Sequence, residues 1–252
     1  MDIHFENGTF MLGDCLERMR ELPDASVDMV LCDLPYGTTQ NKWDAVIPFA
    51  PLWAEYWRVA KPGAAVVLTA AQPFTSALIM SQVDLFRYEW IWRKTRVTGN
   101  LTAKLRPMLA HETVCVFAKQ KTTYYPYTDI KNPLAGIRTP VSKSENYNSP
   151  SQRDDYVRPE LLTKLSVIDG FDVGKDRGMH PTQKPVTLFE YLIRTYTNLG
   201  MTVLDNCAGS GTTAIAAERT GRRWFCIERD RTYFDKAVER VLAEVAAKGL
   251  FA

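Results

Sequence analysis

The amino-acid sequence predicts an α/β fold in which helices cover both faces of a mostly parallel sheet. Short apolar or β-branched runs alternate along the chain with segments whose apolar residues recur at helical spacing. Two of these runs lead directly into an acid, Asp33 and Asp205, as expected where a buried parallel strand ends. With 252 residues, 46% of them apolar, the chain is long enough to bury one sizeable core.

In the amino-terminal half, run length and stop signals define the elements. Pro23 stops the first helical pattern and Pro62-Gly63 closes the second. We expect the last two strands of this half to pair antiparallel at one edge of the sheet. The predicted elements are a strand at 9–12, a helix at 15–22, a strand at 27–33, a helix at 51–59, a strand at 64–69, a helix at 73–83, and strands at 88–92 and 112–117.

The middle of the chain has a different character. Between Lys119 and Met179 the apolar periodicity fades, and Pro, Asn, Ser, Tyr and charged residues prevail. A structureless loop of this length is improbable inside a compact domain, so we expect a functional insert or a segment that orders with a partner. Beyond it, regular elements return: a helix at 186–195, a strand at 201–205, a helix at 212–219, a strand at 224–228 and a helix at 232–248. The predicted organisation is therefore one domain in two halves, 1–120 and 179–252, with an insert at 121–178.

Composition narrows the class of protein. No apolar run approaches the ~18 residues needed to span a bilayer, and the first residues lack the pattern of a signal peptide, so we expect a cytoplasmic protein. The five cysteines show no metal-type spacing and are expected to be reduced. Net charge is only +2, but the stretch 93–184 carries 16 Lys and Arg against 9 Asp and Glu. This basic middle indicates either a polyanion-binding surface or a solvated face.

A glycine-rich turn follows the strand into Asp205. Gly209-Ser210-Gly211 stands between a strand and a helix, where backbone can approach a ligand closely. Glu228 ends the next predicted strand, where an acid commonly accepts both ribose hydroxyls of a bound nucleoside. Ala214 stands where a dinucleotide fold usually has a third glycine, so no pyrophosphate cradle is evident. The pattern favours a nucleoside cofactor without identifying it.

Asp33-Leu34-Pro35-Tyr36 suggests the substrate. The lone pair of an exocyclic amine on adenine or cytosine is delocalised into the ring, which makes that nitrogen a poor nucleophile. A carboxylate from Asp33 and the backbone carbonyl of Leu34 could accept its two N–H groups and so localise and aim the lone pair. Pro35 holds the preceding residue extended, and Tyr36 offers a ring for base stacking. The alternative interpretation is an ordinary strand-to-loop turn.

These motifs together resemble a known family. Gly13-Asp14, the stretch from Asp33 to Tyr36, His180-Pro181-Thr182-Gln183-Lys184-Pro185 and the run from Asp205 to Thr213 occur in the order seen in amino-methylating, S-adenosylmethionine-dependent DNA methyltransferases. The order is similar to their circularly permuted β group, in which the catalytic half precedes the cofactor half. The resemblance implies a Rossmann-like methyltransferase fold with a seven-stranded sheet, a recognition insert, and restriction–modification or related DNA methylation in bacteria or phage.

The resemblance also implies a role for each matching position. Double-stranded DNA would be the partner, and the target base would be flipped out of the duplex for direct in-line methyl transfer. The catalytic residues would be Asp33, Leu34, Pro35 and Tyr36. The cofactor residues would be Asp14, Asp33, Thr182, Gln183, Lys184, Asp205, Ala208, Gly209, Ser210, Gly211, Thr212 and Glu228.

Two departures from the family pattern bear on activity. Leu34 replaces the usual proline of the catalytic tetrad, and because a backbone carbonyl acts there, we expect activity to survive. The first tetrad residue is Asp33 rather than serine, which in this family favours adenine N6 over cytosine N4. No metal is expected, because His4 and His111 have no ligand partners at suitable spacing. His180 precedes a Pro-Thr-Gln-Lys-Pro turn and is interpreted as a structural hydrogen-bonding residue.

Basic side chains in the middle of the chain are candidate DNA contacts. Phosphate contacts would explain the charge, and some polar side chains of the insert would read base edges. The alternative is a solvated insert or an oligomer contact, so a homodimer stays open. The candidate DNA-binding residues are Arg93, Lys94, Arg96, Lys104, Arg106, Arg138 and Arg153.

Three other functions compete with adenine methylation. A cytosine-N4 methyltransferase is the alternative within the same class. A nicotinamide-dependent oxidoreductase would use the turn from Gly209 to Glu228 for a dinucleotide. A catalytically silent nucleic-acid-binding module would bind DNA through the basic middle and transfer no methyl group.

Overall fold

The computed structural model describes residues 1–38, 44–131, 133, 135–137, 157, 160–172 and 183–249. Contacts divide the chain into two compact units, one formed by Met1–Tyr124 with Ser166–Ala252 and the other by Tyr125–Leu165. The larger unit holds the main sheet and is treated first. Among the described residues, no helix is long and apolar enough to cross a membrane.

The larger unit is built on one sheet of nine described strands in the order β1-β2-β11-β10-β3-β4-β6-β5-β9. The central pairs β2 with β11, β11 with β10, β10 with β3, and β3 with β4 are parallel. β6 runs antiparallel to both β4 and β5. The strands are β1 (Asp2–His4), β2 (Gly8–Leu12), β3 (Val27–Asp33), β4 (Ala60–Ala70), β5 (Phe86–Thr98), β6 (Leu109–Phe117), β9 (Val167–Ile168), β10 (Thr202–Asp205) and β11 (Arg223–Glu228).

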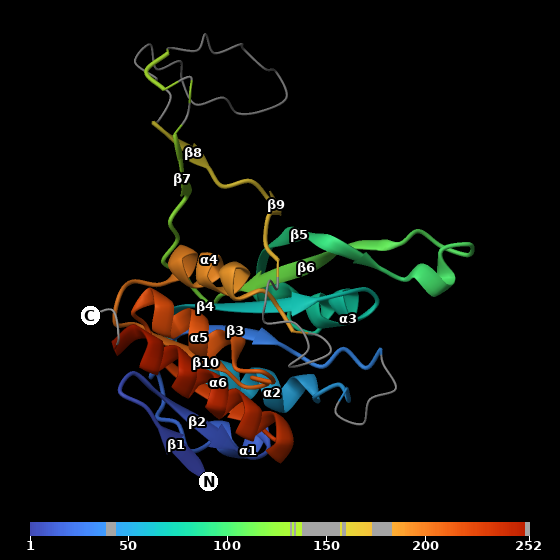
Figure 1. Ribbon diagram of the computed structural model, residues 1–252. Helices are drawn as coiled ribbons and strands as arrows, with labels where there is room; N and C mark the ends of the chain where they lie inside the picture. Colours follow the sequence, from blue (N-terminus) through green and yellow to red (C-terminus); the bar gives the residue numbers. More distant parts are fainter. Residues whose placement is uncertain are drawn as a thin grey trace. The chain divides into compact units, whose positions relative to one another are not determined.

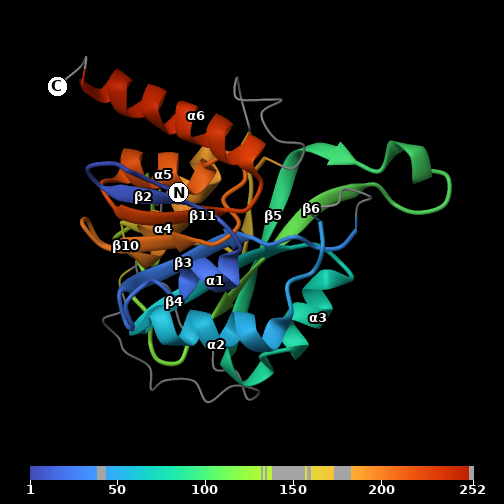
Figure 2. The ribbon, with the colours of Figure 1, turned by 90° about the horizontal axis from the view of Figure 1, so that it is seen from below.

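Helices cover both faces of this sheet, as the view in Figure 2 shows. One layer holds α4, α5 and α6, and the other holds α1, α2 and α3; Figure 1 shows the same elements from the side. The helices are α1 (Cys15–Met19), α2 (Phe49–Val59), α3 (Phe74–Met80), α4 (Val186–Tyr196), α5 (Thr212–Thr220) and α6 (Arg231–Gly249), with short 3-10 turns η1 (Val83–Leu85) and η2 (Asn100–Thr102).

The central strands are apolar on both sides because each side faces a helix layer. In β3, Met29 and Leu31 pack into the core beneath α4, α5 and α6, whereas Val30 and Cys32 pack into the core beneath α1, α2 and α3. All four side chains are fully buried. A strand covered in this way reads as a continuous apolar run, which is the pattern that the sequence shows.

The predicted elements are confirmed, with changes at their ends. The helix expected at 15–22 ends at Met19, because the following N–H groups bond three residues back, as in Leu22 N to Met19 O at 3.0 Å, before Pro23. The strands expected at 88–92 and 112–117 do pair antiparallel, but they extend to Thr98 and Leu109. The expected seven strands are all present, and the short edge strands β1 and β9 enlarge the sheet to nine.

The smaller unit holds a two-stranded antiparallel sheet. β7 (Tyr127–Lys131) pairs with β8 (Leu161–Thr163), with Tyr127 opposite Thr163. Most of the stretch between these strands lies outside the described residues. The division of the chain into two halves and an insert at 121–178 therefore stays a prediction.

Candidate active site

A cavity of about 830 Å³ opens at the carboxyl edge of the parallel strands, within the larger unit. Strands β3 and β10 are neighbours in register, with Met29 opposite Val203, so their carboxyl ends lie at the same edge. Asp33 ends β3 and Asp205 ends β10, and both line the cavity. Two motifs far apart in the sequence thus meet because their strands are adjacent and parallel.

The Asp33 carboxylate is held by three donors. Its Oδ1 atom accepts hydrogen bonds from the Tyr36 hydroxyl, at 2.8 Å, and from the Thr69 hydroxyl. Its Oδ2 atom accepts a hydrogen bond of 2.8 Å from Lys184 Nζ. Thr69 lies opposite Asp33 in the register of β3 with β4, so the strand pairing itself supplies this contact. The orientation of the carboxylate is fixed before any ligand binds.

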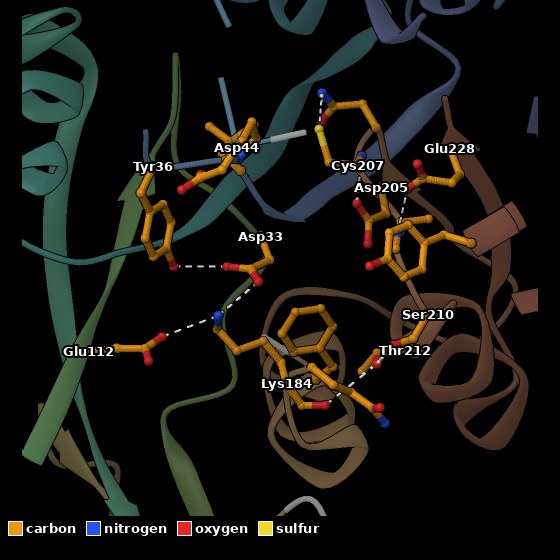
Figure 3. Close-up of a pocket in the computed structure, with 18 of the residues that line it drawn as sticks. Asp33, Tyr36, Asp44, Glu112, Lys184, Asp205, Cys207, Ser210, Thr212 and Glu228 are labelled. Carbon is orange, nitrogen blue, oxygen red and sulfur yellow. Dashed lines mark hydrogen bonds and ion pairs between the residues drawn. The ribbon is translucent and has the colours of Figure 1, made fainter. Parts of the chain in front are cut away.

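Lys184 is the buried cation of the site. Its side chain is only 6% exposed, and its ammonium lies 2.8 Å from Asp33 and 3.2 Å from Oε2 of Glu112. Burial opposes its charge, but the attraction of Asp33, together with that of Glu112, outweighs this effect and raises the pKa of Lys184 well above its usual value. Figure 3 shows the chain of contacts from Tyr36 through Asp33 and Lys184 to Glu112.

Glu112 is a member of the site that sequence analysis did not identify. It directly precedes the buried part of β6 and also pairs with Lys94, whose Nζ lies 3.3 Å from Oε1. The side chains of Glu112 and Lys94 are only 16% and 11% exposed. The available signal was one acid at the head of the otherwise apolar run at 113–117. Thr69 was missed as well, although it stands near the end of the strand next to β3.

The other residues of the predicted catalytic tetrad pack around Asp33. Leu34 is 4% exposed and belongs to the core beneath α1, α2 and α3. The ring of Tyr36 stacks on Phe74, with centroids 5.2 Å apart, and the Lys184 ammonium lies 5.5 Å from the Tyr36 centroid. Burial, then the charge of Asp33, raises the pKa of Tyr36 well above its usual value, so its hydroxyl keeps its proton. All four tetrad residues line the cavity.

The second wall of the cavity is formed by the turn after β10 and the end of β11. Gly209 has a positive φ of 51°, and its N–H donates to Oε2 of Glu228 at 2.9 Å. Burial raises the pKa of Glu228, while the N–H groups of Asp230 and Gly209 oppose that shift. Arg240 of α6 donates to the carbonyl of Ser210 at 2.9 Å and so ties the turn to the helix. This wall lies to the right of Asp33 in Figure 3.

Asp205, which the sequence predicts to contact the cofactor, is deeply buried. It is 2% exposed, accepts the N–H of Cys207 at 3.0 Å, and accepts the hydroxyl of Thr213. Burial raises the pKa of Asp205 from 3.8 to about 6, although these hydrogen bonds work against the shift. A nearby positive charge would stabilise the ionised form of this buried carboxyl group.

Polar groups without partners mark the cavity as a place for a polar ligand. Both amide atoms of Gln183 and the Nε1 atom of Trp92 are buried and have no hydrogen-bond partner among the described residues. Both side chains line the cavity, whose volume is in the range of ligand pockets. Since buried polar groups are normally satisfied, a ligand with donors and acceptors fits this arrangement.

The cavity brings together most of the residues predicted for the cofactor. Asp14 also caps α1, where its Oδ1 accepts the N–H of Leu16 at 2.9 Å. Gly211 does not line the cavity: it has a positive φ of 75°, and an added Cβ would lie 3.3 Å from Ala237 of α6, so its place is set by packing. Thr182 lies outside the described residues. The predicted residues that line the cavity are Asp14, Asp33, Gln183, Lys184, Asp205, Ala208, Gly209, Ser210, Thr212 and Glu228.

The basic residues predicted to bind DNA have different surroundings. Lys94 is inside the cavity with Glu112, and Arg93 pairs with Asp169 although it is largely exposed. Arg96 lines the cavity. Lys104 and Arg106 are exposed at the tip of the β5–β6 hairpin, while Arg138 and Arg153 lie outside the described residues.

This arrangement can orient a flat polar group against a nucleoside. One wall offers an anchored carboxylate with a buried cation behind it, and the other offers a glycine turn and two acids. The five cysteines are all free thiols. Among the described residues, no three His, Cys, Asp or Glu side chains are grouped in a way that could hold a metal ion.

Comparison with known proteins agrees with this arrangement. A family model described as "DNA methylase" matches residues 27–239. The type II methyltransferase M.HinfI of Haemophilus influenzae is 26% identical over 262 residues, covering 92% of this chain and 68% of that protein.

Solved structures share the fold. The M1.HpyAVI–SAM complex superposes with a TM-score of 0.61 at 22% identity, covering 92% of this chain and 98% of that one. The cytosine-N4-specific PvuII DNA methyltransferase gives 0.63 at 18%, covering 95% and 91%. TTHA0409 of Thermus thermophilus, described as a putative DNA modification methylase in complex with S-adenosylmethionine, gives 0.59 at 22%, covering 94% and 95%.

Proposed function

The chain belongs to the N6/N4 DNA methylase family, whose model matches residues 27–239, and on that premise we propose that it methylates the exocyclic N6 of adenine in duplex DNA. It is a DNA methyltransferase, and its methyl donor is S-adenosylmethionine. Because the chain belongs to this family, the alternative function of a nicotinamide-dependent oxidoreductase is excluded. One observation carries the proposal: the anchored Asp33 carboxylate and the Gly209 turn line the same cavity.

The cofactor residues divide by the chemistry they offer. Glu228 accepts the two ribose hydroxyls, since each of its oxygens accepts a backbone N–H, from Gly209 or Asp230, and has a further lone pair to offer. The carboxylate of Asp205 attracts the positively charged methionine part of the methyl donor. Gln183 supplies an unpaired amide to the same ligand. When bound, S-adenosylmethionine supplies a methyl group on a positively charged sulfur.

Asp33 receives the target base. An exocyclic amine donates one N–H to Oδ2 of Asp33 and the other to the backbone carbonyl of Leu34, which aims the nitrogen lone pair out of the ring plane. Tyr36 and Thr69 hold Oδ1, and Lys184 compensates the negative charge of Asp33. Positioning of this kind needs no covalent intermediate. The target base must leave the duplex to enter such a cavity.

The choice of adenine rests on the identity of residue 33. A carboxylate at the first tetrad position leans toward adenine N6, whereas serine is associated with cytosine N4. The comparisons include a cytosine-N4-specific enzyme, so the two products must be separated by experiment. The basic side chains of the β5–β6 hairpin and the insert at 121–178 are proposed to hold and recognise the duplex.

Methyl transfer and its product can be measured together. Purified protein is incubated with unmethylated plasmid DNA and S-adenosylmethionine labelled in the methyl group, and the DNA is digested to nucleosides and separated. We expect the label in N6-methyldeoxyadenosine; N4-methyldeoxycytidine as sole product would overturn the adenine assignment. Protein carrying Asp33→Asn, purified in parallel, controls for contaminating host methylases. DNA binding without any transfer would instead support a silent binding module.

A further inference from the structure

The hairpin formed by β5 and β6 extends beyond the other strands of the sheet, as both ribbon views show. Thr98 is the last residue of β5 paired with β6, opposite Leu109, so residues 99–108 form the tip. Thr95, Arg96 and Thr98 of the same strand line the cavity. The tip therefore stands at the end of an arm that starts at the mouth of the active site.

Two leucines at this tip are exposed to an unusual degree. Leu101 is fully exposed, at 102%, and Leu105 is 87% exposed. Val97 and Leu109 on the two strands below are also about half exposed, at 46% and 44%. Single exposed leucines are common, but a cluster on a projecting arm usually marks a contact surface.

Hydrogen bonds hold the tip of the hairpin in a defined conformation. The carbonyl of Thr102 accepts the N–H groups of Leu105, at 2.9 Å, and Arg106, at 3.0 Å. The hydroxyl of Thr102 donates to the carbonyl of Gly99 and accepts Nε of Arg106 at 3.1 Å. Gly99 turns the chain with a positive φ of 97°. These bonds hold the two leucines in place without burying them.

The charge of the hairpin indicates which kind of partner its tip would contact. The stretch 93–108 carries five Lys and Arg and no Asp or Glu. Arg93 and Lys94 are paired with acids, whereas Arg96, Lys104 and Arg106 form no ion pair among the described residues. Two such arms from two copies of this chain would repel each other, while a phosphate backbone would attract them.

We propose that Leu101 and Leu105 form an apolar wedge that enters the DNA duplex beside the target base, while Lys104 and Arg106 hold the flanking phosphates. This inference rests on the proposed function. In known DNA-binding proteins, apolar side chains inserted between base steps partially unstack them. A wedge on an arm that starts at the cavity acts where a base has to leave the stack.

The test uses the full-length protein and a synthetic duplex that contains the sequence the enzyme modifies in plasmid DNA. Leu101→Ala/Leu105→Ala is expected to weaken binding to this duplex about tenfold or more, because the alanines would no longer help to unstack a paired base. A second duplex carries a mismatch at the target base, which is cheaper to extrude. On it we expect a loss of less than about threefold, since the wedge has less stacking to break.

Two matched variants separate the wedge from other effects. Leu199→Ala removes another largely exposed leucine, at 76%, before the amino end of β10, and is expected to change neither affinity. Lys104→Gln/Arg106→Gln is expected to weaken binding to both duplexes alike. With 2-aminopurine at the target position, fluorescence should rise on binding of the parent protein and rise much less with the double leucine variant.

Three results would overturn the wedge. The first is an equal loss of affinity for the matched and mismatched duplexes in the double leucine variant. The second is a loss of affinity no larger than that of Leu199→Ala. The third is a change from dimer to monomer in the double leucine variant while the DNA affinity per protomer is unchanged. Methyl transfer by the parent protein is measured on the same duplex. If the parent methylates DNA and the leucine variant behaves like it, the wedge fails and the proposed function stands.

Discussion

The Nζ atom of Lys184 donates a hydrogen bond of 2.8 Å to Oδ2 of Asp33, across 151 residues of chain. This contact joins the segment before α4 to the end of β3. Both predicted halves of the chain thus contribute to one partly buried ion pair, with Glu112 as a second acid on the far side of the ammonium.

Asp33→Asn should reduce methyl transfer at least about a hundredfold, because the amide offers its NH₂ group where the base amine needs an acceptor. The affinity for S-adenosylmethionine should change little, since the proposed mechanism assigns Asp33 to the base and not to the cofactor, where the family resemblance also placed it. Initial rates and calorimetric titration of the cofactor measure the two effects. Asp84→Asn alters an exposed acid and is the control. A variant with the parent's rate would remove Asp33 from the reaction.

Lys184→Met should lower the free energy of unfolding by about 3 kcal/mol, because it leaves Asp33 without its buried cation. The loss should be smaller when Asp33→Asn is already present, as a double-mutant cycle in urea would reveal. Lys61→Met is a matched comparison: its ammonium also lies 2.8 Å from an acid, Asp28, but is 44% exposed. That substitution should cost no more than about 1 kcal/mol. Equal costs at the two sites would contradict the importance of burial.

Asp205→Asn should stabilise the protein at neutral pH. The folded pKa of Asp205 is raised from 3.8 to about 6, so the fold favours the protonated form. Stability due to this group is present at low pH and is lost as pH rises from about 4 through about 6. A shift of this size is worth roughly 3 kcal/mol, and asparagine cannot ionise. Denaturation at pH 4, 6 and 8 should show the variant's advantage growing with pH; a constant difference would contradict the assignment.

Cofactor binding should depend on the same group. A positively charged donor beside Asp205 favours the ionised carboxylate, so the affinity for S-adenosylmethionine should increase as pH rises through about 6. In Asp205→Asn this part of the pH dependence should disappear, and affinity at pH 8 should fall. Titrations between pH 5 and 8 test the linkage. If the affinity of both proteins changed with pH in the same way, a group other than Asp205 would be responsible for the pH dependence.

The exposed cations of the hairpin should determine the salt dependence of DNA binding. Removing Lys104 or Arg106 should reduce the slope of log affinity against log salt by about 0.9 each, since each contact releases a condensed counterion. Lys236→Gln alters an exposed lysine of α6, outside both the hairpin and the insert, and should leave the slope unchanged. Fluorescence anisotropy across a salt series gives the slopes. An unaltered slope in Lys104→Gln and Arg106→Gln would move the phosphate contacts away from this arm.

Several members of the site could not be predicted from local sequence. Lys94 is one of several similar cations in a basic stretch, and nothing local separates it from Arg93 or Arg96. Its pairing with Glu112 follows from the register of β5 with β6, in which Trp92 lies opposite Glu112. Gly211 is the opposite case. Its motif predicted a contact with the ligand, but a Cβ added there would meet Phe10, Ala237 and Val241. In both cases the neighbours come from distant segments.

Sequence patterns were enough to predict the α/β class, the order of the central elements and the two strand ends at which Asp33 and Asp205 stand. These follow from local physics, since apolar period, proline and glycine act within a few residues. The tertiary structure alone decided that Glu112 and Lys94 enter the cavity, that Lys184 bridges two acids, and that Leu101 and Leu105 stay uncovered. Each of these depends on which strands pair and in what register, and that choice is made by burial of the whole core.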